Sequence, residues 1–293
     1  MIELSEGVAL SRYTTLGTGG PARWFARPES VDELVEALAW ARDHGSAVEV
    51  VGLGSNLLVH DDGVEALVLR LAGELAAVSA DGVELTAGGG ATNAVCLHRA
   101  RAAGLGGLEF ASAIPGTAGG GVRMNAGAYG REWRDILVEA VVADADGVRT
   151  LAAADLDLAY RHSGLRPGEV VAQVRFRLEP RDPAEIKGEV ARLLARRKAT
   201  QPTTKRTFGS VFKNPDHELG AGRMLEECGL KGHRIGGALI SPRHANFIEN
   251  AGGATSADAI ALMAEARRRA YETFGVELEH EVRFLGPLAL PPL

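Results

Sequence analysis

A glycine-rich stretch from Ile114 to Gly130 constrains the fold of this 293-residue chain more than any other feature. Glycine and alanine dominate it, and its few large apolar side chains include Ile114, Val122 and Met124. Glycine loses much conformational freedom on folding and buries no side chain, so such a stretch is not expected to form a packed core. It also lacks the serines and charges that are typical of flexible linkers. We therefore expect a bare backbone laid against a large anionic ligand.

A second glycine-containing loop, Gly52–Leu57, follows a short apolar run at Ala47–Val51 that predicts a buried strand. Glycine lets the backbone turn tightly, and successive N–H groups can surround an anion. Ser55 and Asn56 add side-chain donors. Taken alone, such a loop is as often only a tight turn. Two such loops together suit a ligand that carries two phosphates between two heterocycles.

Several common kinds of site are excluded by the sequence. No lysine directly follows a glycine, so there is no Walker A loop. The dinucleotide fingerprint is not completed, because Leu57 stands where its third glycine would be. His217-Glu218 and His280-Glu281 are not followed by the second histidine of a metalloprotease helix, and no Gly-x-Ser-x-Gly hydrolase motif is present. The histidines are scattered, and we predict no metal site.

Composition narrows the class of protein further. A formal net charge of −6 argues against nucleic acid as the main partner, because binding phosphate backbones needs a basic face. Cys96 and Cys228 are too few for a disulfide framework. No apolar run reaches membrane-spanning length, and the first residues carry acids where a signal peptide needs bases. We expect a cytoplasmic protein with no membrane partner.

Hydrophobic periodicity predicts helices and strands that alternate along the chain, in a mixed α and β fold. Asp81-Gly82 and Asp146-Gly147 predict two-residue hairpin turns. Ser30 with Glu33, and Thr255 with Asp258, form capping patterns at helix starts. The predicted helices cover residues 31–44, 92–103, 183–199 and 256–274, and the predicted strands cover residues 47–51, 57–59, 66–69, 170–178 and 278–285.

Seven blocks of sequence resemble the UDP-N-acetylenolpyruvoylglucosamine reductase family, in the same order along nearly the whole chain. The blocks are Gly52–Leu57, Ile114–Tyr129, Tyr160–Ser163, Gly209–Pro215, Gly236-Gly237, His244–Ile248 and Glu281–Phe284. One such loop would be weak evidence, whereas seven blocks in order are specific.

The resemblance implies an α+β fold. A two-domain FAD-binding unit of the PCMH or vanillyl-alcohol-oxidase type is joined by a smaller α+β substrate-binding domain. The expected FAD-binding subdomains are residues 1–70 and 71–200, and the UDP-sugar domain is residues 201–275. A C-terminal strand at about residues 276–293 is expected to return to the first subdomain.

The resemblance also implies an activity. Members reduce UDP-N-acetylglucosamine enolpyruvate to UDP-N-acetylmuramate with NADPH and non-covalently bound FAD, in peptidoglycan precursor synthesis. The hydride comes from flavin N5, and Ser210 matches the proton donor. A serine is a weak acid, but a carbanion-like intermediate is a strong base, so position matters more than acidity. Arg161 matches the arginine that holds the enolpyruvyl carboxylate, and Glu281 matches the third active-site residue.

The remaining site residues are expected from the same matches. NADPH and a UDP-sugar are the expected small-molecule partners, and we expect a monomer. The expected substrate-binding residues are Tyr160, Lys213, Asn214 and Asn246. The expected cofactor-binding residues are Gly52, Gly54, Ser55, Asn56, Leu57, Ile114, Pro115, Gly116, Thr117, Gly119, Gly120, Asn125 and Ala126.

Two departures and two alternatives accompany this interpretation. His280 stands where the family commonly has a proline, which removes a restraint on φ before Glu281. No tyrosine lies between Tyr160 and Tyr271, so the chain resembles the shorter class that lacks a tyrosine lid. The alternatives are an FAD oxidase with the same cofactor fold and a non-catalytic UDP-sugar binder. Standing alone, Ser210 would be a turn residue, and Glu281 with Arg283 an ion pair on one strand face.

Overall fold

The computed structural model describes residues 2–293 and divides the chain into two compact units. The first unit holds the N-terminal residues up to Glu6 together with Trp24–Leu53 and Ala66–Arg196. The second unit holds Gly7–Arg23, Gly54–Glu65 and Arg197–Leu293. Each unit therefore combines segments that are distant in sequence. The division into two FAD-binding subdomains and a substrate domain stays a prediction.

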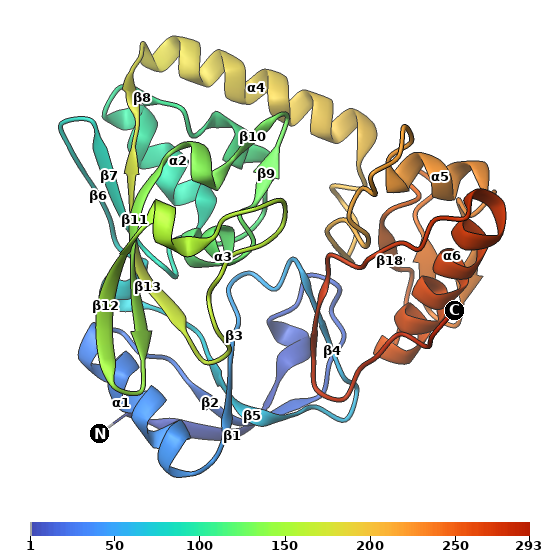
Figure 1. Ribbon diagram of the computed structural model, residues 1–293, viewed down its shortest axis with the longest axis horizontal. Coiled ribbons are helices and arrows are strands. Elements are labelled where there is room, and N and C mark those ends of the chain that lie inside the picture. Colours follow the sequence, from blue (N-terminus) through green and yellow to red (C-terminus); the bar gives the residue numbers. More distant parts are fainter. Residues whose placement is uncertain (1) are drawn as a thin grey trace. The chain divides into compact units, whose positions relative to one another are not determined.

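Two sheets dominate the first unit, with helices packed on them (Figure 1). The larger sheet is antiparallel and has the order β12-β11-β13-β7-β6, and the smaller has the order β1-β2-β5-β3. The strands of the larger sheet are β6 (Val78–Asp81), β7 (Glu84–Gly88), β11 (Leu137–Asp144), β12 (Gly147–Ala152) and β13 (Val170–Arg177). Those of the smaller are β1 (Leu4–Ala9), β2 (Pro21–Ala26), β3 (Ala47–Val50) and β5 (Val64–Leu69), and parts of β1, β2 and β5 are assigned to the second unit.

The helices of the first unit confirm the predicted capping and add one that the sequence did not predict. Ser30 accepts the backbone N–H of Glu33 and Thr92 accepts that of Val95, so both side chains cap helix starts. The helices are α1 (Val31–Asp43), α2 (Asn93–Ala102), the unpredicted α3 (Ala118–Arg123) and most of α4 (Pro183–Thr200). Two short strand pairs complete the unit: β8 (Leu105–Gly106) with β14 (Glu179–Pro180), and β9 (Gly127–Ala128) with β10 (Arg131–Glu132).

Both predicted hairpins form, but their turns are centred one residue from the predicted dipeptides. Asp81 pairs with Glu84, so Gly82 is the first central residue of its turn and has a φ of +55°. Asp144 pairs with Gly147, so Gly147 is already the first residue of the returning strand. A left-handed φ costs glycine nothing, which explains Gly82 at that position.

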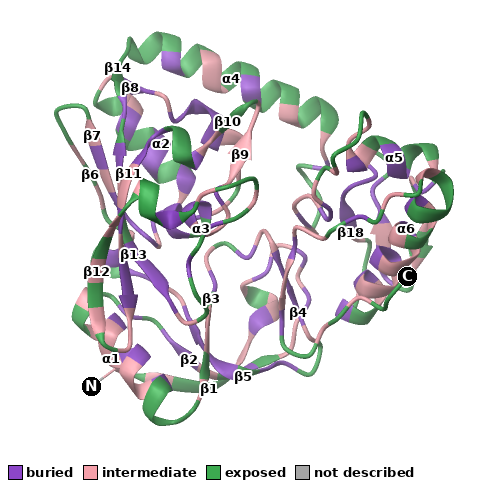
Figure 2. Cartoon of the chain, in the orientation of Figure 1, coloured by how far each residue is buried: buried purple, intermediate pink, exposed green. Residues whose placement is uncertain are grey.

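Aromatic stacking organises the main core of the first unit. The Trp133 side chain is fully buried. Its ring is stacked on Phe176 at 4.9 Å between centroids, and Phe110 meets it edge-on at 5.6 Å. The helix α3 packs on β13 beside this cluster, and Figure 2 shows that α3 is largely buried. The glycine-rich stretch is therefore partly a core element.

The second unit contains a four-stranded sheet and two helices. The sheet has the order β15-β18-β17-β16, and a separate parallel pair joins β4 to β19. Its helices are α5 (Ala221–Glu227) and α6 (Ser256–Phe274), and its strands are β4 (Leu57–Val59), β15 (Thr207–Phe208), β16 (Arg234–Ile235), β17 (Ala238–Ile240), β18 (Ile248–Asn250) and β19 (Arg283–Leu285).

The start of α6 confirms the predicted capping box and adds a distant partner. Thr255 accepts the N–H of Asp258, and the Asp258 carboxylate accepts that of Thr255. The Asp61 carboxylate also accepts both the backbone N–H and the hydroxyl of Ser256, at 2.8 and 2.7 Å. Backbone N–H groups at a helix start need such acceptors, so α6 fixes the loop that follows β4.

The last predicted strand is shorter in the structure. Residues 278–285 were predicted as one strand, but only Arg283–Leu285 forms β19. The segment before it contacts a different partner, because Lys213 donates to the Glu279 carbonyl and the Glu281 N–H donates to Val211. Residues 279–281 bond to the segment 211–213, whereas residues 283–285 pair with β4, so the predicted strand is not one continuous strand.

Within residues 2–293, no helix is long and apolar enough to cross a membrane. The same residues contain no cluster of histidine, cysteine, aspartate or glutamate that could hold a metal ion. Burial raises the pKa of the Cys96 thiol to about 12, which keeps it protonated and unreactive.

Candidate active site

The glycine-rich stretch has two faces with different purposes. Its helix α3 begins at Thr117, whose side chain accepts the Gly120 N–H. On the inward face, a Cβ at Gly119 would lie 2.9 Å from the Gly89 carbonyl oxygen, and a Cβ at Gly121 would overlap the Trp133 ring. These glycines are required by the packing of the protein on itself. The expectation that such a stretch forms no packed core is wrong for this face. The assignment of Gly119 to cofactor binding stays a prediction.

The outward face of the same stretch remains open. Gly120 and Pro115 are exposed, and Gly116 is half-buried. A Cβ at Gly116 or Gly120 would meet only side-chain atoms, at 3.6 and 3.4 Å. Neither glycine is therefore required by close packing. A bare backbone open on one side matches what a large flat cofactor needs for close approach.

Asn93 secures the start of this open face. Its N–H donates to the Gly116 carbonyl at 3.0 Å, and its Nδ2 donates to the Ile114 carbonyl at 2.9 Å. The side chain is 2% exposed, and its Oδ1 has no hydrogen-bond partner among the described residues. A buried acceptor left unpaired is costly, and a hydroxyl or amide of a bound cofactor would satisfy it. The residues here fit FAD.

The first glycine loop also packs closely on its own chain. In the first unit, a Cβ at Gly52 would lie 2.9 Å from the Thr117 side chain, so the loop meets the glycine-rich stretch. In the second unit, Gly54 has a φ of +64° and a Cβ there would overlap the Tyr13 carbonyl oxygen. Both glycines are therefore required by the fold, and Gly52 packs directly on the predicted cofactor residue Thr117.

Arg161 lies on a turn that is tied to the glycine-rich stretch. Its φ is +54°, and one guanidinium nitrogen donates to the Gly127 carbonyl at 2.9 Å. The Tyr160 ring lies under the guanidinium at 4.9 Å, and Tyr160 is itself 47% exposed. A left-handed φ in an arginine costs on the order of 1–3 kcal/mol, and such strain persists only where the surroundings enforce it.

Two neighbours enforce that turn. Asn125 is fully buried and donates from Nδ2 to the Ala159 carbonyl at 2.9 Å, while its Oδ1 accepts the Arg134 N–H. The Ser163 hydroxyl donates to the Arg123 carbonyl at 2.8 Å. The Asn125 amide is thus occupied by protein groups, which favours a role in holding the Arg161 turn over direct contact with the cofactor.

The second unit brings Ser210 and Glu281 to the same place as the loop Gly54–Leu57. Gly209 donates its N–H to the Ser55 carbonyl, and the Glu281 N–H donates to the Val211 carbonyl at 2.8 Å. Asn56 Nδ2 donates to the Glu281 carbonyl at 3.1 Å. Ser210 and Glu281 are both half-buried. Two of the three predicted catalytic residues therefore lie on adjoining segments beside a predicted cofactor loop.

Thr15 is a residue of this cluster that the sequence analysis missed. Its hydroxyl donates to the Thr207 carbonyl at 2.6 Å, and its N–H donates to the Gly54 carbonyl at 3.1 Å. It therefore ties the cofactor loop to the strand that leads into Ser210. Asn93 was missed for the same reason. Both act through backbone groups that are distant in sequence, and no local motif marks such contacts.

The predicted substrate residues of the second unit differ in their surroundings. Lys213 pairs its ammonium with the exposed Glu279 carboxylate at 2.6 Å. Asn214 is exposed, and its Oδ1 accepts the N–H of Ala221 at the start of α5. Asn246 is only 4% exposed and bonds to the backbone of Phe212. Only Lys213 and Asn214 have side chains that reach solvent.

His280 compensates for the proline that it replaces. Its ring stacks on Phe284 at 4.4 Å with an interplanar angle of 7°. Its Nδ1 lies 2.7 Å from the Val282 carbonyl oxygen, which assigns the proton to Nδ1. The residue also forms an isolated bridge with Phe212. Packing and hydrogen bonding thus fix the backbone before Glu281, where a proline would have fixed it through φ.

We expect His244 to make the stability of this region depend on pH. Its Nδ1 accepts the Asn246 N–H at 3.2 Å. Burial, reinforced by the charge of Lys231 and only partly opposed by Glu226, lowers the pKa of His244 from the ordinary 6.5. Because the folded state binds the proton less well than the unfolded state, the stability is complete above about pH 6.5 and is lost as the pH falls below it.

We expect His244→Asn to remove this pH dependence. Urea unfolding at pH 8 and at pH 5.5 should show a larger loss of unfolding free energy for the unchanged protein than for the variant. Protonation of carboxylates between the two pH values changes the unfolding free energy of both proteins equally, so the difference between the proteins reports on His244. Equal losses in the two proteins would contradict the assignment of a neutral His244.

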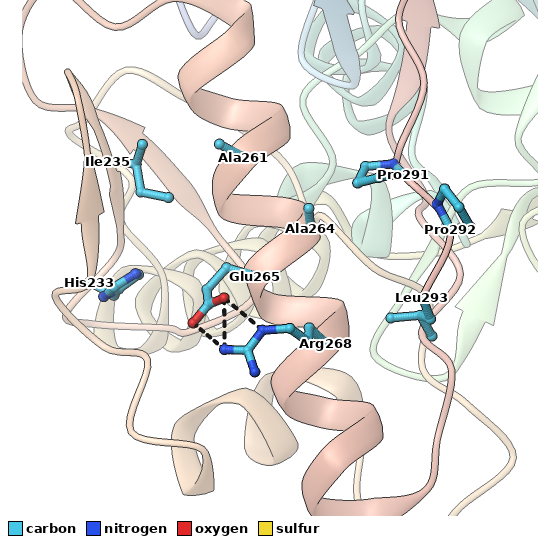
Figure 3. A pocket seen from close by; sticks show the side chains of 9 residues that line it. All are labelled: His233, Ile235, Ala261, Ala264, Glu265, Arg268, Pro291, Pro292 and Leu293. Carbon is cyan, nitrogen blue, oxygen red and sulfur yellow. Dashed lines mark hydrogen bonds and ion pairs between the residues drawn. The ribbon is translucent and has the colours of Figure 1, made fainter.

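A separate groove of about 430 Å³ lies in the second unit (Figure 3). It is lined by His233, Ile235, Ala261, Ala264, Glu265, Arg268, Pro291, Pro292 and Leu293. Its charged groups are paired, since the Glu265 carboxylate binds the Arg268 guanidinium as Figure 3 shows. None of the predicted site residues lines it, so this groove is distinct from the Ser210 cluster.

Comparison with known proteins identifies the family. Residues 201–285 match the family model described as UDP-N-acetylenolpyruvoylglucosamine reductase, C-terminal domain, and residues 22–151 match an FAD binding domain. UDP-N-acetylenolpyruvoylglucosamine reductase from Anaeromyxobacter dehalogenans is 46% identical over 94% of this chain and 84% of that protein. The reductase from Paracoccus denitrificans is 44% identical over 97% and 96%.

A solved structure agrees with these matches. The crystal structure of UDP-N-acetylenolpyruvylglucosamine reductase from Thermus caldophilus superposes with a TM-score of 0.84 and 38% sequence identity, over 97% of this chain and 99% of that one. The predicted fold class and the predicted FAD are thereby confirmed. The chain belongs to the UDP-N-acetylenolpyruvoylglucosamine reductase family, and it is an FAD-dependent oxidoreductase.

Proposed function

We propose that this enzyme reduces UDP-N-acetylglucosamine enolpyruvate to UDP-N-acetylmuramate with NADPH, in the cytoplasmic synthesis of peptidoglycan precursors. The observation that carries the proposal is the convergence of Ser210, Glu281 and the loop Gly54–Leu57 within the second unit. The names of the similar reductases support the substrate. The extents of the two family models, residues 22–151 and 201–285, support separate FAD and UDP-sugar domains.

The reaction requires a hydride at one carbon of the enolpyruvyl double bond and a proton at the other. Bound FAD supplies hydride transfer from NADPH to the substrate. Ser210 Oγ–H donates the proton to the neighbouring carbon, and the serine recovers its proton from water. The hydride brings two electrons and one hydrogen, the proton brings the second hydrogen, and the two new C–H bonds replace the carbon–carbon π bond. A weak acid suffices because the carbon is a strong base at that moment.

The other two catalytic residues act on the charge that develops between these steps. Arg161 binds the enolpyruvyl carboxylate, because a guanidinium fork matches the planar geometry of a carboxylate. Its fixed turn supports this role, since Asn125 and Ser163 hold the backbone on either side. Glu281 acts together with Arg161 at the enolate that forms between the two steps. The ring stacking and hydrogen bond of His280 fix the backbone that leads into Glu281.

Binding residues complete the proposal. The open face of Pro115, Gly116 and Gly120, with the Asn93 acceptor beneath it, holds FAD without a covalent bond. Gly54–Leu57 is a further proposed FAD-binding segment, with backbone and side-chain donors. Tyr160, Lys213 and Asn214 contact the UDP-sugar. The chain acts as a monomer and uses no tyrosine lid.

NADPH oxidation, followed with and without UDP-N-acetylglucosamine enolpyruvate, tests the function. We expect turnover only when the UDP-sugar is present, with one NADPH consumed for each UDP-N-acetylmuramate formed. Oxygen consumption is followed in parallel, because an FAD oxidase would consume oxygen without the UDP-sugar. Turnover that is indifferent to the UDP-sugar would overturn the proposal. Binding of the sugar with no NADPH oxidation would identify a non-catalytic binder.

A further inference from the structure

The segment that carries Ser210 is held by one buried side chain. Asn246 Nδ2 donates to the Phe212 carbonyl at 2.8 Å, and Asn246 Oδ1 accepts the Phe212 N–H at 2.9 Å. The Asn246 carbonyl accepts the Val211 N–H at 2.9 Å. Three hydrogen bonds from one residue thus fix the two residues that follow Ser210.

This arrangement leaves Asn246 poorly placed to bind substrate. Its side chain is only 4% exposed, and both ends of the amide are used by the backbone of Phe212. Recruiting either end for a ligand would leave a buried Phe212 N–H or carbonyl without its partner, which is costly. The substrate contact expected for Asn246 from sequence therefore conflicts with the hydrogen bonds that it makes.

The Asn246 amide adds to two backbone hydrogen bonds beside Phe212, in which Lys213 donates to the Glu279 carbonyl and Glu281 donates to the Val211 carbonyl. Phe212 is joined to His280 only by an isolated bridge, and it belongs to no named strand. The Asn246 amide supplies a donor and an acceptor on Phe212, as a neighbouring strand would. On the other side of Ser210, Gly209 is held by the Ser55 carbonyl at 2.9 Å. Ser210 therefore lies between two anchored residues.

Asn246 is in turn held by its own turn. Its N–H donates to His244 Nδ1 at 3.2 Å, and Phe247 donates to the His244 carbonyl at 3.0 Å. Ser241 donates to the Phe247 carbonyl at 2.8 Å, which joins the turn to the end of β17. The amide is thus presented to Phe212 from a fixed backbone, as a positioning role requires.

We propose that Asn246 is a positioning residue that aims the Ser210 hydroxyl through Val211 and Phe212, and that it does not bind the UDP-sugar. The inference rests on the proposed role of Ser210 as proton donor. A shift of about 1 Å in a reacting group can cost about 100-fold in rate. Loosening the Phe212 backbone should therefore reduce protonation of the substrate while it leaves substrate binding intact.

The first test is Asn246→Asp in the full enzyme with FAD bound. The substitution keeps the acceptor for the Phe212 N–H but places an oxygen against the Phe212 carbonyl. We expect kcat to fall about 10- to 100-fold. The KM for the UDP-sugar and the rate of flavin reduction by NADPH should each stay within about twofold, since neither requires the serine. A rise in KM with little change in kcat would instead identify a substrate ligand and overturn the proposal.

Asn250→Asp provides a control for the loss of an asparagine amide that holds backbone groups, although Asn250 is half-buried where Asn246 is buried. Asn250 Nδ2 donates to the Leu16 carbonyl at 3.0 Å, and its Oδ1 accepts the N–H groups of Gly252 and Ala254. It resembles Asn246 in chemistry and lies in the same unit, but it holds a different part of the backbone. We expect the kcat of Asn250→Asp to stay within about threefold of that of the unchanged enzyme, while its melting temperature falls about as much as that of Asn246→Asp. An equal fall in kcat for both variants would mean that instability alone explains the effect.

A double-mutant cycle with Ser210→Ala separates positioning from a general structural effect. If Asn246 acts through the serine, then Asn246→Asp should cause no further loss of kcat once Ser210 is alanine. If the fold-loss of kcat in the double variant equalled the product of the two single losses, the inference would be overturned. Full activity of Ser210→Ala alone would instead refute the proton-donor role, so the two failures are distinguishable. Asn246→Ser, which is smaller and uncharged, should show the same pattern and replaces Asn246→Asp in the cycle if that protein does not fold.

Discussion

Ser210→Ala should still allow NADPH to reduce the bound flavin at an unchanged rate, while reduction of the UDP-sugar falls by about 10²- to 10⁴-fold. That range is the usual worth of a positioned proton donor. The Ser210 hydroxyl is not needed for electrons to enter the flavin, so the first half-reaction should be untouched. The alanine also leaves the anchored backbone at Gly209 and Val211 in place, and the loss should therefore appear in kcat. Stopped-flow absorbance measures the two half-reactions separately.

Ser241→Ala controls for the removal of a serine hydroxyl from the same unit. The Ser241 side chain is fully buried, and its Oγ accepts the Arg243 N–H at 3.2 Å. We expect a small loss of stability and a kcat within about threefold of the unchanged protein, because a lost hydrogen bond of this kind costs about 1 kcal/mol. If Ser210→Ala retained full activity in the same assay, Ser210 would have no part in the mechanism.

Gly121→Ala should be among the most destabilising single methyl additions in the protein. The new Cβ would overlap Trp133, whose ring is fully buried between Phe176 and Phe110. The tryptophan cannot move away without breaking that stacking, and the helix backbone of α3 cannot retreat from the sheet. We expect a loss of about 3 kcal/mol, at the upper end of the range for overpacked cores. Urea unfolding of the protein without FAD measures it.

Gly120→Ala is the matched control, one residue away on the opposite face. Its Cβ would lie 3.4 Å from Thr117 Oγ1, an ordinary contact. Alanine favours a helix interior by up to about 1 kcal/mol over glycine, so stability should hold or rise. The affinity for FAD should fall at least about tenfold if the outward face carries the cofactor. Unchanged FAD affinity would refute that placement, and a fully stable Gly121→Ala would refute the packing explanation.

Local signals in the sequence predicted much of the secondary structure. The caps predicted at Ser30 and Thr255 place two helix starts correctly, because a side chain and an N–H three residues later suffice to define them. The helix α3 could not be predicted in this way, since glycine disfavours helices. It forms because its bare inward face fits against Trp133 and Gly89, and neither partner is indicated by the glycine-rich stretch itself.

The sequence could predict which residues belong to the candidate site, but not which contacts their side chains make. Resemblance to a family pointed to Ser210, Arg161 and Glu281, and the structure joins Ser210 to Glu281 through Val211. The sequence could not indicate whether an asparagine binds a ligand or the backbone, because the amide suits both. Asn125 and Asn246 prove to be occupied by backbone groups. That distinction depends on burial, which only tertiary structure reveals.

The parallel pairing of β4 with β19 has a consequence for how the protein is made. Leu57 meets Arg283, a residue 226 positions later in the chain, and the Arg283 N–H also holds the Asn56 carbonyl. At about 5–20 residues per second, a ribosome needs on the order of 10 to 50 seconds to add that partner. Until then the Asn56 carbonyl lacks the Arg283 N–H, and β4 lacks its parallel partner. We expect nascent chains that stop before Arg283 to bind FAD weakly, so the cofactor would be captured at the end of synthesis.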